Sequence, residues 1–160
     1  GLILPRPVQQ AFSLEVTRVS EELNSDLGPD EIYQLFIDTY ANKVSPLKLL
    51  TYQENMINEQ NFTISALIEY QGKEHTVNGS GNGLLDAFCQ AMQNFLDRKF
   101  EITAYQEHAL NRGSSSKAIT YVEIQNGDDK SHIGCGISSS ISKSSLRAVV
   151  SSINRMLDFS

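Results

Sequence analysis

The sequence has no excess of basic residues and no long apolar run, and each absence excludes a class of protein. Its 13 Lys and Arg residues stand against 19 Asp and Glu, a net charge of −6 at pH 7, whereas a nucleic-acid partner requires a basic face. No apolar stretch approaches the roughly 20 residues of a membrane-spanning helix, and nothing resembles a signal peptide. We therefore expect a protein that binds neither nucleic acid nor a membrane.

Cysteine and the common catalytic motifs are also scarce. Cys89 and Cys135 are the two cysteines of the sequence, too few for a disulfide framework, so we expect a reducing compartment, the cytoplasm. His75, His108 and His132 lack the spacing of metal ligands, and neither HExxH nor CxxC occurs. We expect no metal and no cofactor in this chain, and we expect both cysteines to pack rather than to react.

Length and periodicity divide the chain into a helical part and a part rich in strands. Its 160 residues suffice for one domain with a small appendage, and the first residue is Gly1 rather than Met, which suggests a piece of a longer protein. Two helices are predicted over 5–23 and 29–40, and Pro46 ends this region. We predict a helical linker subdomain over 1–50 and a second domain over 51–160. The residues expected to face the core of the helical part are Val8, Phe12, Val16, Val19, Leu23, Ile32, Leu35, Phe36 and Tyr40.

The remainder of the chain shows one pattern twice: three strands followed by a helix. Gly79 and Gly81 correspond to Gly134 and Gly136 in this duplication. Two βββα units related by a pseudo-twofold axis, preceded by a small helical subdomain, make an α+β fold. The predicted strands are 48–57, 61–71, 73–80, 100–110, 116–127 and 130–138, and the predicted helices are 84–96 and 140–157. The residues expected to face the core from these helices include Leu85, Phe88, Met92, Phe95, Leu96, Ile141, Leu146, Val149, Val150 and Ile153.

The stretch GSGNGLLDAF, residues 79–88, places three glycines before a helix. It does not fit a dinucleotide fingerprint, because Leu84 stands at the third glycine position and the preceding strand alternates and is polar. A P-loop lysine is also missing. Two interpretations stay open: the glycines close a strand onto a helix, or free N–H groups at the helix start bind a carboxylate.

Other polar groups suggest structural roles. Glu107 and His108 are adjacent in a predicted strand and therefore point to opposite faces, which argues against an acid–base pair. The serine-rich stretch 138–145 precedes a helix, and its serines are candidates for helix capping. None of these patterns resembles an active site.

Three blocks resemble a known family. They are GSGNGLLDAF, AYQEHALNRGSSSKAITYVEI over 104–124, and GCGISSSISKSSLRAVVSSINR over 134–155. Together they resemble the C-terminal allosteric domain of 2-isopropylmalate synthase, the first committed enzyme of leucine biosynthesis. That family shows a GNGP turn, a YxEHA strand end and a GxGI strand before an ASLRAV-like helix. LPRPVQQAFS, residues 4–13, resembles the preceding linker subdomain, and Leu84, Ser116 and Ser144 depart from the usual Pro, Ala and Ala.

The resemblance implies a regulatory domain that dimerises and binds L-leucine where the two βββα copies meet, for feedback inhibition. It also implies that acetyl-CoA condensation belongs to a TIM-barrel with a divalent metal. This catalytic domain is absent here, so the chain alone should be inactive, and that domain would be its partner in the full-length protein. Carried over by position, the leucine-binding residues are Gly81, Asn82, Gly83, Leu85, Asp86, Ile102, Tyr105, Ala109, Ser116 and Ile141.

These residue types suit a free amino acid. Turn N–H groups suit the carboxylate, Asp86 suits the ammonium, and the apolar side chains with the ring of Tyr105 suit an isobutyl group, whose burial contributes roughly 1.5–3 kcal/mol. Three alternatives stay open. They are an isoleucine-binding regulatory domain of citramalate synthase, since the placement of one methyl is worth only about 1–3 kcal/mol, a dimerisation module without ligand, and a free-standing enzyme.

Overall fold

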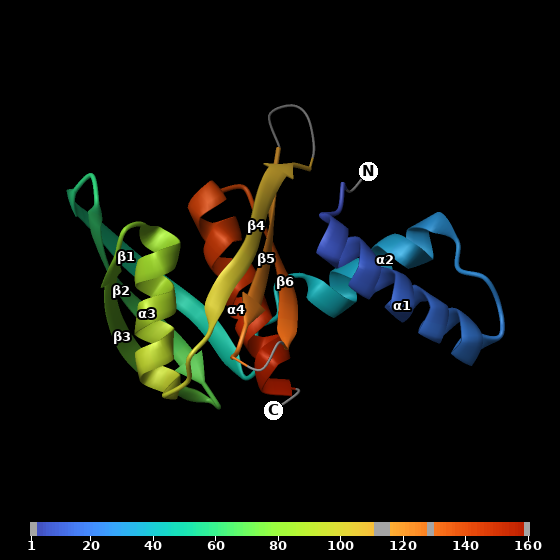
Figure 1. Ribbon diagram of the computed structural model, residues 1–160, viewed down its shortest axis with the longest axis horizontal. Helices are drawn as coiled ribbons and strands as arrows, with labels where there is room; N and C mark the ends of the chain where they lie inside the picture. Colours follow the sequence, from blue (N-terminus) through green and yellow to red (C-terminus); the bar gives the residue numbers. More distant parts are fainter. Residues whose placement is uncertain (1–2, 111–115, 128–129, 159–160) are drawn as a thin grey trace.

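The computed structural model describes residues 3–110, 116–127 and 130–158, and Figure 1 shows two helices beside two successive sheet-and-helix units. Each sheet is an antiparallel meander, in the orders β1-β2-β3 and β4-β5-β6. We call β1–β3 with α3 unit 1, and β4–β6 with α4 unit 2. The predicted α+β class with two βββα units is confirmed. The elements are α1 (Arg6–Leu23), α2 (Pro29–Tyr40), β1 (Leu47–Asn58), β2 (Asn61–Tyr70), β3 (Lys73–Gly81), α3 (Leu84–Leu96), β4 (Glu101–Ala109), β5 (Ala118–Gln125), β6 (Ser131–Ser138) and α4 (Ile141–Asp158).

The two units share one hydrophobic core. Ile68 of β2 and Phe88 of α3 belong to the same buried cluster as Val122 of β5 and Leu146 of α4, and all four side chains are at most 1% exposed. The helices α3 and α4 contact each other, and α4 also contacts β1 of the other unit. The duplicated halves therefore form a single packed body.

Glycines bring each helix close to the last strand of its unit. A Cβ atom on Gly79 would collide with the backbone oxygen of Ala87 on α3, and one on Gly136 would collide with the backbone oxygen of Ser144 on α4. A Cβ on Gly134 would lie 2.6 Å from the backbone oxygen of Ala148. Only glycine permits this separation. The interpretation that the glycines close a strand onto a helix is confirmed.

A second core lies on the opposite face of the sheet of unit 2, under α1 and α2 (Figure 1). Phe36 of α2 is fully buried, with ring centroids of Phe12 at 5.3 Å and Tyr121 at 6.1 Å. The predicted inward stripe of α1 holds for Val8 and Phe12 but is wrong for Leu23, which is 58% exposed. The reason is that α1 extends beyond the sheet, so its C-terminal end has no strand beneath it (Figure 1).

The segment between α2 and β1 is tied to the strands and helix of unit 2. The side chain of Asn42 accepts from the N–H of Ile137 at 2.9 Å and donates to its carbonyl at 3.3 Å, as a neighbouring strand would. The amide of Asn154 accepts from the N–H of Leu47 at 2.9 Å and donates to the carbonyls of Lys43 and Leu47. Arg155 donates to the carbonyl of Thr39 at 3.0 Å. These contacts fix the helical pair relative to α4.

Within the described part of the chain, no helix is both long enough and apolar enough to cross a membrane.

Candidate ligand site

The turn between β3 and α3 is held by Asp86. Its Oδ2 accepts the N–H of Asn82 at 2.8 Å, so the carboxylate folds back from the first turn of α3 onto the chain before it. Gly81 makes room for this arrangement, since a Cβ atom there would lie 2.7 Å from Cγ of Asp86. The turn residues Gly81, Asn82, Gly83 and Asp86 are thus one local unit, as their spacing predicts.

The first turn of α3 lacks a side-chain cap. Gly83 stands at the N-cap position and no side chain bonds the free N–H groups there. By contrast, Ser140 Oγ accepts the N–H of Lys143 at the start of α4. Uncapped N–H groups at a helix start carry partial positive charge and suit an anion. The backbone at Gly83 is extended, with no atom within 4 Å of where its Cβ would lie, so the turn is open on this side.

A second group of the predicted residues lies on β4 and at the start of α4. The hydroxyl of Tyr105 bonds Oε2 of Glu107 at 2.9 Å and lies 3.1 Å from Oγ of Ser145, which links the strand to the helix. Burial raises the pKa of Tyr105; the contact with Glu107 adds to the rise and the one with Ser145 opposes it. Tyr105 is 46% exposed, so part of the residue is accessible to a ligand.

The remaining predicted site residues differ in exposure. Leu85 and Ile102 pack against the shared core, and Ser116 is half-buried before β5. Ala109 is exposed, and so is Ile141, at 60%. The prediction that Ile141 faces the core is wrong, because it is the first residue of α4 and the helix meets the glycines of β6 only from Ser144 onward. Residues 111–115 of the second resembling block lie outside the described residues.

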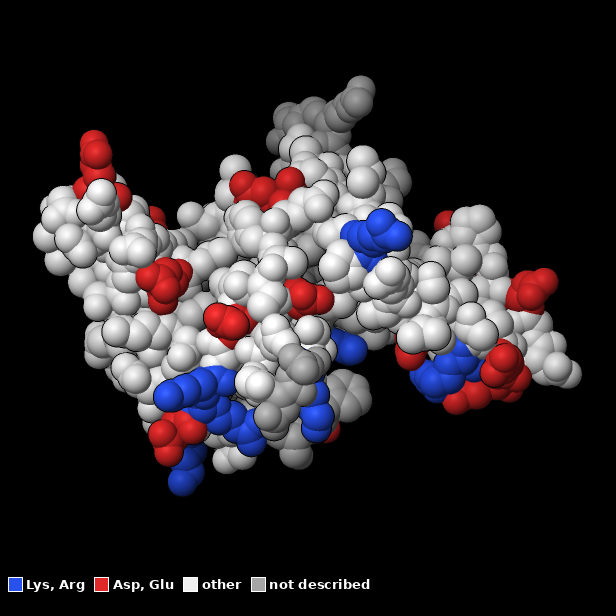
Figure 2. Space-filling view, in the orientation of Figure 1, with Lys and Arg blue, Asp and Glu red and all other residues white. Residues whose placement is uncertain are grey.

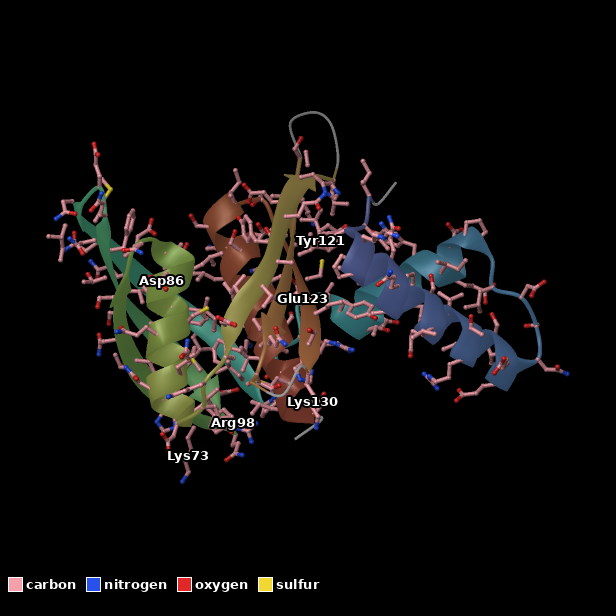
Figure 3. The ribbon with its side chains drawn as sticks, viewed as in Figure 1. Lys73, Asp86, Arg98, Tyr121, Glu123 and Lys130 are labelled. Carbon is pink, nitrogen blue, oxygen red and sulfur yellow. The ribbon has the colours of Figure 1, made fainter. Side chains whose placement is uncertain are left out.

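The structure assembles these residues in two groups. The hollow beside Tyr105 measures about 60 Å³ and is lined by residues of α1, β4 and β5, among them Val8 and Tyr121, and by no residue of the turn. Figure 3 shows Asp86 near the upper end of α3. In Figure 2 acidic side chains are spread over the two units, while one group of basic side chains lies at the lower edge, near Lys73, Arg98 and Lys130, and others lie over the helical pair at the right. An acidic surface favours a ligand with a positive group.

The cysteines and histidines fill structural positions. Burial raises the pKa of Cys89 to about 12, with Asp86 adding to the rise, and burial also raises that of Cys135, so both thiols stay protonated near neutral pH. His108 packs its ring 5.5 Å from that of Tyr121, on the face opposite to the Glu107–Tyr105 contact. The prediction that Glu107 and His108 point to opposite faces of the strand is confirmed. Among the residues that the structure describes, no three His, Cys, Asp or Glu side chains gather as metal ligands do.

Sequence reasoning missed the serines on the buried face of α4. Ser144 is fully buried, with its Oγ 2.9 Å from Oγ1 of Thr120 and donating to the carbonyl of Ile141 at 2.9 Å. Ser152 similarly donates to the carbonyl of Val122 at 3.0 Å. Of the serines expected to cap, Ser140 does so. The signal that could have found the others is their spacing: Ser144, Ala148 and Ser152 are each four residues apart and therefore share one face of the helix.

The fold and this site together define a duplicated βββα module that carries a helical pair, and the comparisons with known proteins name its family. The matching family model is described as the LeuA allosteric (dimerisation) domain and covers residues 26–157. The 2-isopropylmalate synthase of Clostridium acetobutylicum is 39% identical over 160 residues, 97% of this chain and 28% of that protein. Those of Desulfitobacterium hafniense and Acetoanaerobium sticklandii are 36% and 35% identical, each over 98% of this chain and 28% of the relative.

The chain belongs to the family of the LeuA allosteric (dimerisation) domain. The resemblance inferred from the three sequence blocks is thereby confirmed. The chain spans 28% of the length of these curated relatives, so it corresponds to one part of a longer protein in each of them.

Proposed function

We propose that the chain is the regulatory part of a 2-isopropylmalate synthase, that it binds L-leucine, and that it forms a homodimer. In the complete enzyme, leucine bound here would inhibit a catalytic domain that lies outside this chain. The observation that carries the proposal is the match of relatives bearing that enzyme's name to 97–98% of the chain at 35–39% identity. The family's description as an allosteric and dimerisation domain supports both the ligand and the assembly.

The β3–α3 turn offers partners for both charged ends of leucine. The uncapped first turn of α3 supplies N–H groups for the carboxylate. Asp86 uses Oδ2 for the N–H of Asn82, and its other carboxylate oxygen is available for the ammonium group. A charge-assisted hydrogen bond of this kind is about twice as strong as a neutral one. The zwitterion is thus recognised over a few consecutive residues.

The side chain of leucine would contact Leu85 of unit 1 and Ile102 and Tyr105 of unit 2. Since Leu85 lies on α3 and the other two residues lie on β4, the ligand would bridge the two units. This suits a regulatory role, because a ligand that contacts residues of both units stabilises the conformation in which those residues lie together. The isoleucine-binding and ligand-free alternatives are less well supported, since the relatives described above are named for the leucine pathway.

Titration calorimetry with the twenty amino acids tests the proposal. Leucine should bind and, at about 100 times its dissociation constant, raise the unfolding free energy by about 2.7 kcal/mol if only the folded state binds. Valine should bind more weakly because it buries less apolar surface, and lysine should give no heat. A signal with isoleucine and none with leucine would move the assignment to citramalate synthase. No signal with any amino acid would leave only the dimerisation module.

A matched pair of variants locates the site. Asp86→Asn keeps an oxygen for the N–H of Asn82 but loses the charge that meets the ammonium, so leucine affinity should fall about tenfold or more. Asp97→Asn makes the same change at the C-cap of α3, where the left-handed backbone suits asparagine. Its affinity for leucine should equal that of the unmodified chain. Equal affinities of both variants would remove Asp86 from the site.

A further inference from the structure

The hydroxyl group of Tyr105 is hydrogen-bonded on both sides. It donates to Oε2 of Glu107 at 2.9 Å, and its oxygen lies 3.1 Å from Oγ of Ser145. A phenol carries a single proton, so with that proton on Glu107 the hydroxyl of Ser145 donates the second bond. Ser145 is buried, at 5% exposure, whereas Tyr105 is one of the large exposed side chains. An exposed ring is thus held at its far end.

The two bonds reach Tyr105 from different elements. Glu107 follows it by two positions on β4, so both side chains lie on one face of the sheet. Their partners across the sheet, Val122 and Thr120 of β5, are buried, which places this face toward the core. Ser145 belongs to α4, which packs on β5. A ring fixed at its far end from a strand and from a helix loses its alternative rotamers.

The start of α4 is itself held by a hydroxyl contact. Oγ of Ser144 lies 2.9 Å from Oγ1 of Thr120, and both residues are fully buried between the helix and β5. Ile141 begins the helix and is 60% exposed. It precedes Ser145 by four residues, and side chains at that spacing lie on one face of a helix. The same anchored turn therefore presents an exposed apolar side chain and holds the hydroxyl of Tyr105.

We propose that Glu107 and Ser145 are positioning residues of the leucine site, which fix Tyr105 so that its ring, and not its hydroxyl proton, meets the side chain of the ligand. This role rests on the proposed function, in which Tyr105 is a wall of that site, and it states what makes the wall rigid. Because the hydroxyl proton is bonded to Glu107, it is not available to a polar group of a ligand. The fixed ring therefore suits an apolar side chain, and the hydroxyl of threonine would find no donor on it.

A fixed wall also separates leucine from isoleucine. The two side chains have the same number of carbon atoms, one branched at Cγ and the other at Cβ, so the apolar area that they bury distinguishes them little. Discrimination must come from shape, and a wall discriminates by shape only if it does not move aside. We expect a ring released from Glu107 and Ser145 to adapt to either branch. Both bonds thus contribute to selectivity as well as to affinity.

One substitution separates positioning by Glu107 from attraction by its charge. Glu107→Gln removes the negative charge and keeps a side-chain oxygen that accepts the proton of Tyr105, whereas Glu107→Ala removes both. If Glu107 positions the ring, Glu107→Gln should keep the leucine affinity within about twofold, and Glu107→Ala should lower it about threefold or more, as the loss of a hydrogen bond does. Equal losses in both variants would assign the effect to charge and overturn the positioning role of Glu107.

A double-mutant cycle in titration calorimetry tests the bond between Ser145 and Tyr105. In the unmodified chain, Ser145→Ala should raise the dissociation constant of leucine about three- to tenfold and that of isoleucine less, so the ratio of the two constants moves toward one. In the background of Tyr105→Phe, which has no hydroxyl to hold, the same substitution should change the leucine constant by no more than about 1.5-fold.

Glu123→Ala is the matched control. Glu123 likewise accepts from a hydroxyl, that of Thr103 at 2.7 Å, but it alternates with Val122 on β5 and so lies on the other face of the sheet. Its loss should leave the leucine affinity unchanged.

Carbon NMR of tyrosine labelled in the ring reports the two bonds in the absence of leucine. The ring carbon that bears the hydroxyl of Tyr105, assigned by its absence in Tyr105→Phe, should shift in Ser145→Ala and in Glu107→Ala but not in Glu123→Ala. Unshifted signals of the other tyrosines show that each variant is folded.

The positioning roles are overturned by equal losses from Ser145→Ala in both backgrounds of the cycle, by an unchanged ratio of leucine to isoleucine affinity, or by a Tyr105 signal that does not respond. Leucine heat that is insensitive to all these variants would remove the positioning roles and keep the proposed function. No heat with leucine from the unmodified chain would overturn the proposed function and the positioning roles together.

Discussion

The two βββα units have the same topology and opposite surroundings. In unit 2 both faces of the sheet are covered, one by α4 and the other by α1 and α2, and most of β5 and β6 is buried. In unit 1 only the face toward α3 and the core is covered, and β1 is largely exposed. The helix α4 contacts both sheets, whereas α3 lies mainly on its own. Unit 2 is therefore the structural centre, and unit 1 is the half that is free to meet a ligand or a partner.

The comparison shows that a duplication fixes the backbone and leaves the environment of each copy to change. Gly81 and Gly136 both permit close packing of a helix, but Gly81 accommodates the carboxylate of Asp86 and Gly136 the backbone of α4. The helix that starts after Gly81 is uncapped, while Ser140 caps its counterpart. We therefore expect the same turn to serve binding in one unit and packing in the other.

The largest expected effect on stability comes from removing the aromatic packing between α2 and the sheet of unit 2. Phe36→Ala should lower the unfolding free energy by about 3–5 kcal/mol, because it leaves a cavity among three aromatic rings. Leu14→Ala, on the exposed side of α1, should cost no more than about 0.5 kcal/mol. Urea denaturation measures both. A small effect of Phe36→Ala would show that unit 2 does not need its helical cover.

A graded series of glycine variants sharpens the comparison of the two turns. Gly136→Ala should cost about 3 kcal/mol, because its Cβ would meet the backbone of α4 at the oxygen of Ser144 and the nitrogen of Ala148. Gly81→Ala should cost less, about 1–2 kcal/mol, because its nearest contacts are with the movable side chain of Asp86 and the one backbone contact, with the nitrogen of Ala87, is longer, at 2.8 Å. Gly83→Ala, with open space around it, should stay within about 0.5 kcal/mol. Thermal denaturation of the three variants gives the order of their losses of stability. If Gly81→Ala were as costly as Gly136→Ala, the two turns would be equally rigid.

The hydrogen bonds from Asn154 of α4 to the chain around the start of β1 should contribute less to the unfolding free energy than the packing of Phe36. Asn154→Ala should cost about 1–3 kcal/mol, because it leaves the buried N–H and carbonyl of Leu47 without their partners. Asn94→Ala, on the exposed side of α3, is the control in the other unit and should be nearly neutral. The backbone N–H of Leu47 should exchange its hydrogen faster in Asn154→Ala than in the unmodified chain, and Asn94→Ala should not change this rate. Unchanged exchange there would contradict the assigned role of Asn154.

The smallest expected effect is a dependence on pH in unit 2. Burial lowers the pKa of His132 below its ordinary value of 6.5, and Arg155 and Lys130 lower it further. The unfolded chain then binds the proton more readily than the folded one, so stability is full above about pH 6.5 and declines as the pH falls below it, toward the lowered pKa. His132→Gln should lose less stability than the unmodified chain between about pH 7.5 and about pH 5.5 in urea denaturation. Equal losses would count against this role of His132.

Much of the fold could be predicted because periodicity and turn residues are local signals. The alternation of Ile64, Ala66 and Ile68 places β2 with one buried face, and the structure agrees. Periodicity could not show where α1 passes beyond the sheet, so Leu23 was assigned to a core that ends before it. The prediction that Ile141 faces the core was wrong for a similar reason, because α4 begins to pack against β6 one turn later. Both errors concern how far a neighbouring element extends.

The candidate site was predictable only in part. The turn from Gly81 to Asp86 is continuous in sequence, so its spacing describes it well. The contact of Tyr105 with Ser145 joins residues 40 positions apart and depends on the packing of β4 against α4, which the sequence pattern does not contain.

The bonds from α4 back to the region before β1 also set an order of events during synthesis. Asn154 and Arg155 reach residues 111 and 116 positions earlier in the chain. When α1 and α2 leave the ribosome, the strands that will cover Phe12 and Phe36 have not been made, and the shared core still lacks its last helix. A chain interrupted before α4 therefore exposes the apolar surface of the shared core and is prone to aggregate. Because α4 covers this core, a ribosomal pause before it prolongs the time for which the nascent chain depends on chaperones.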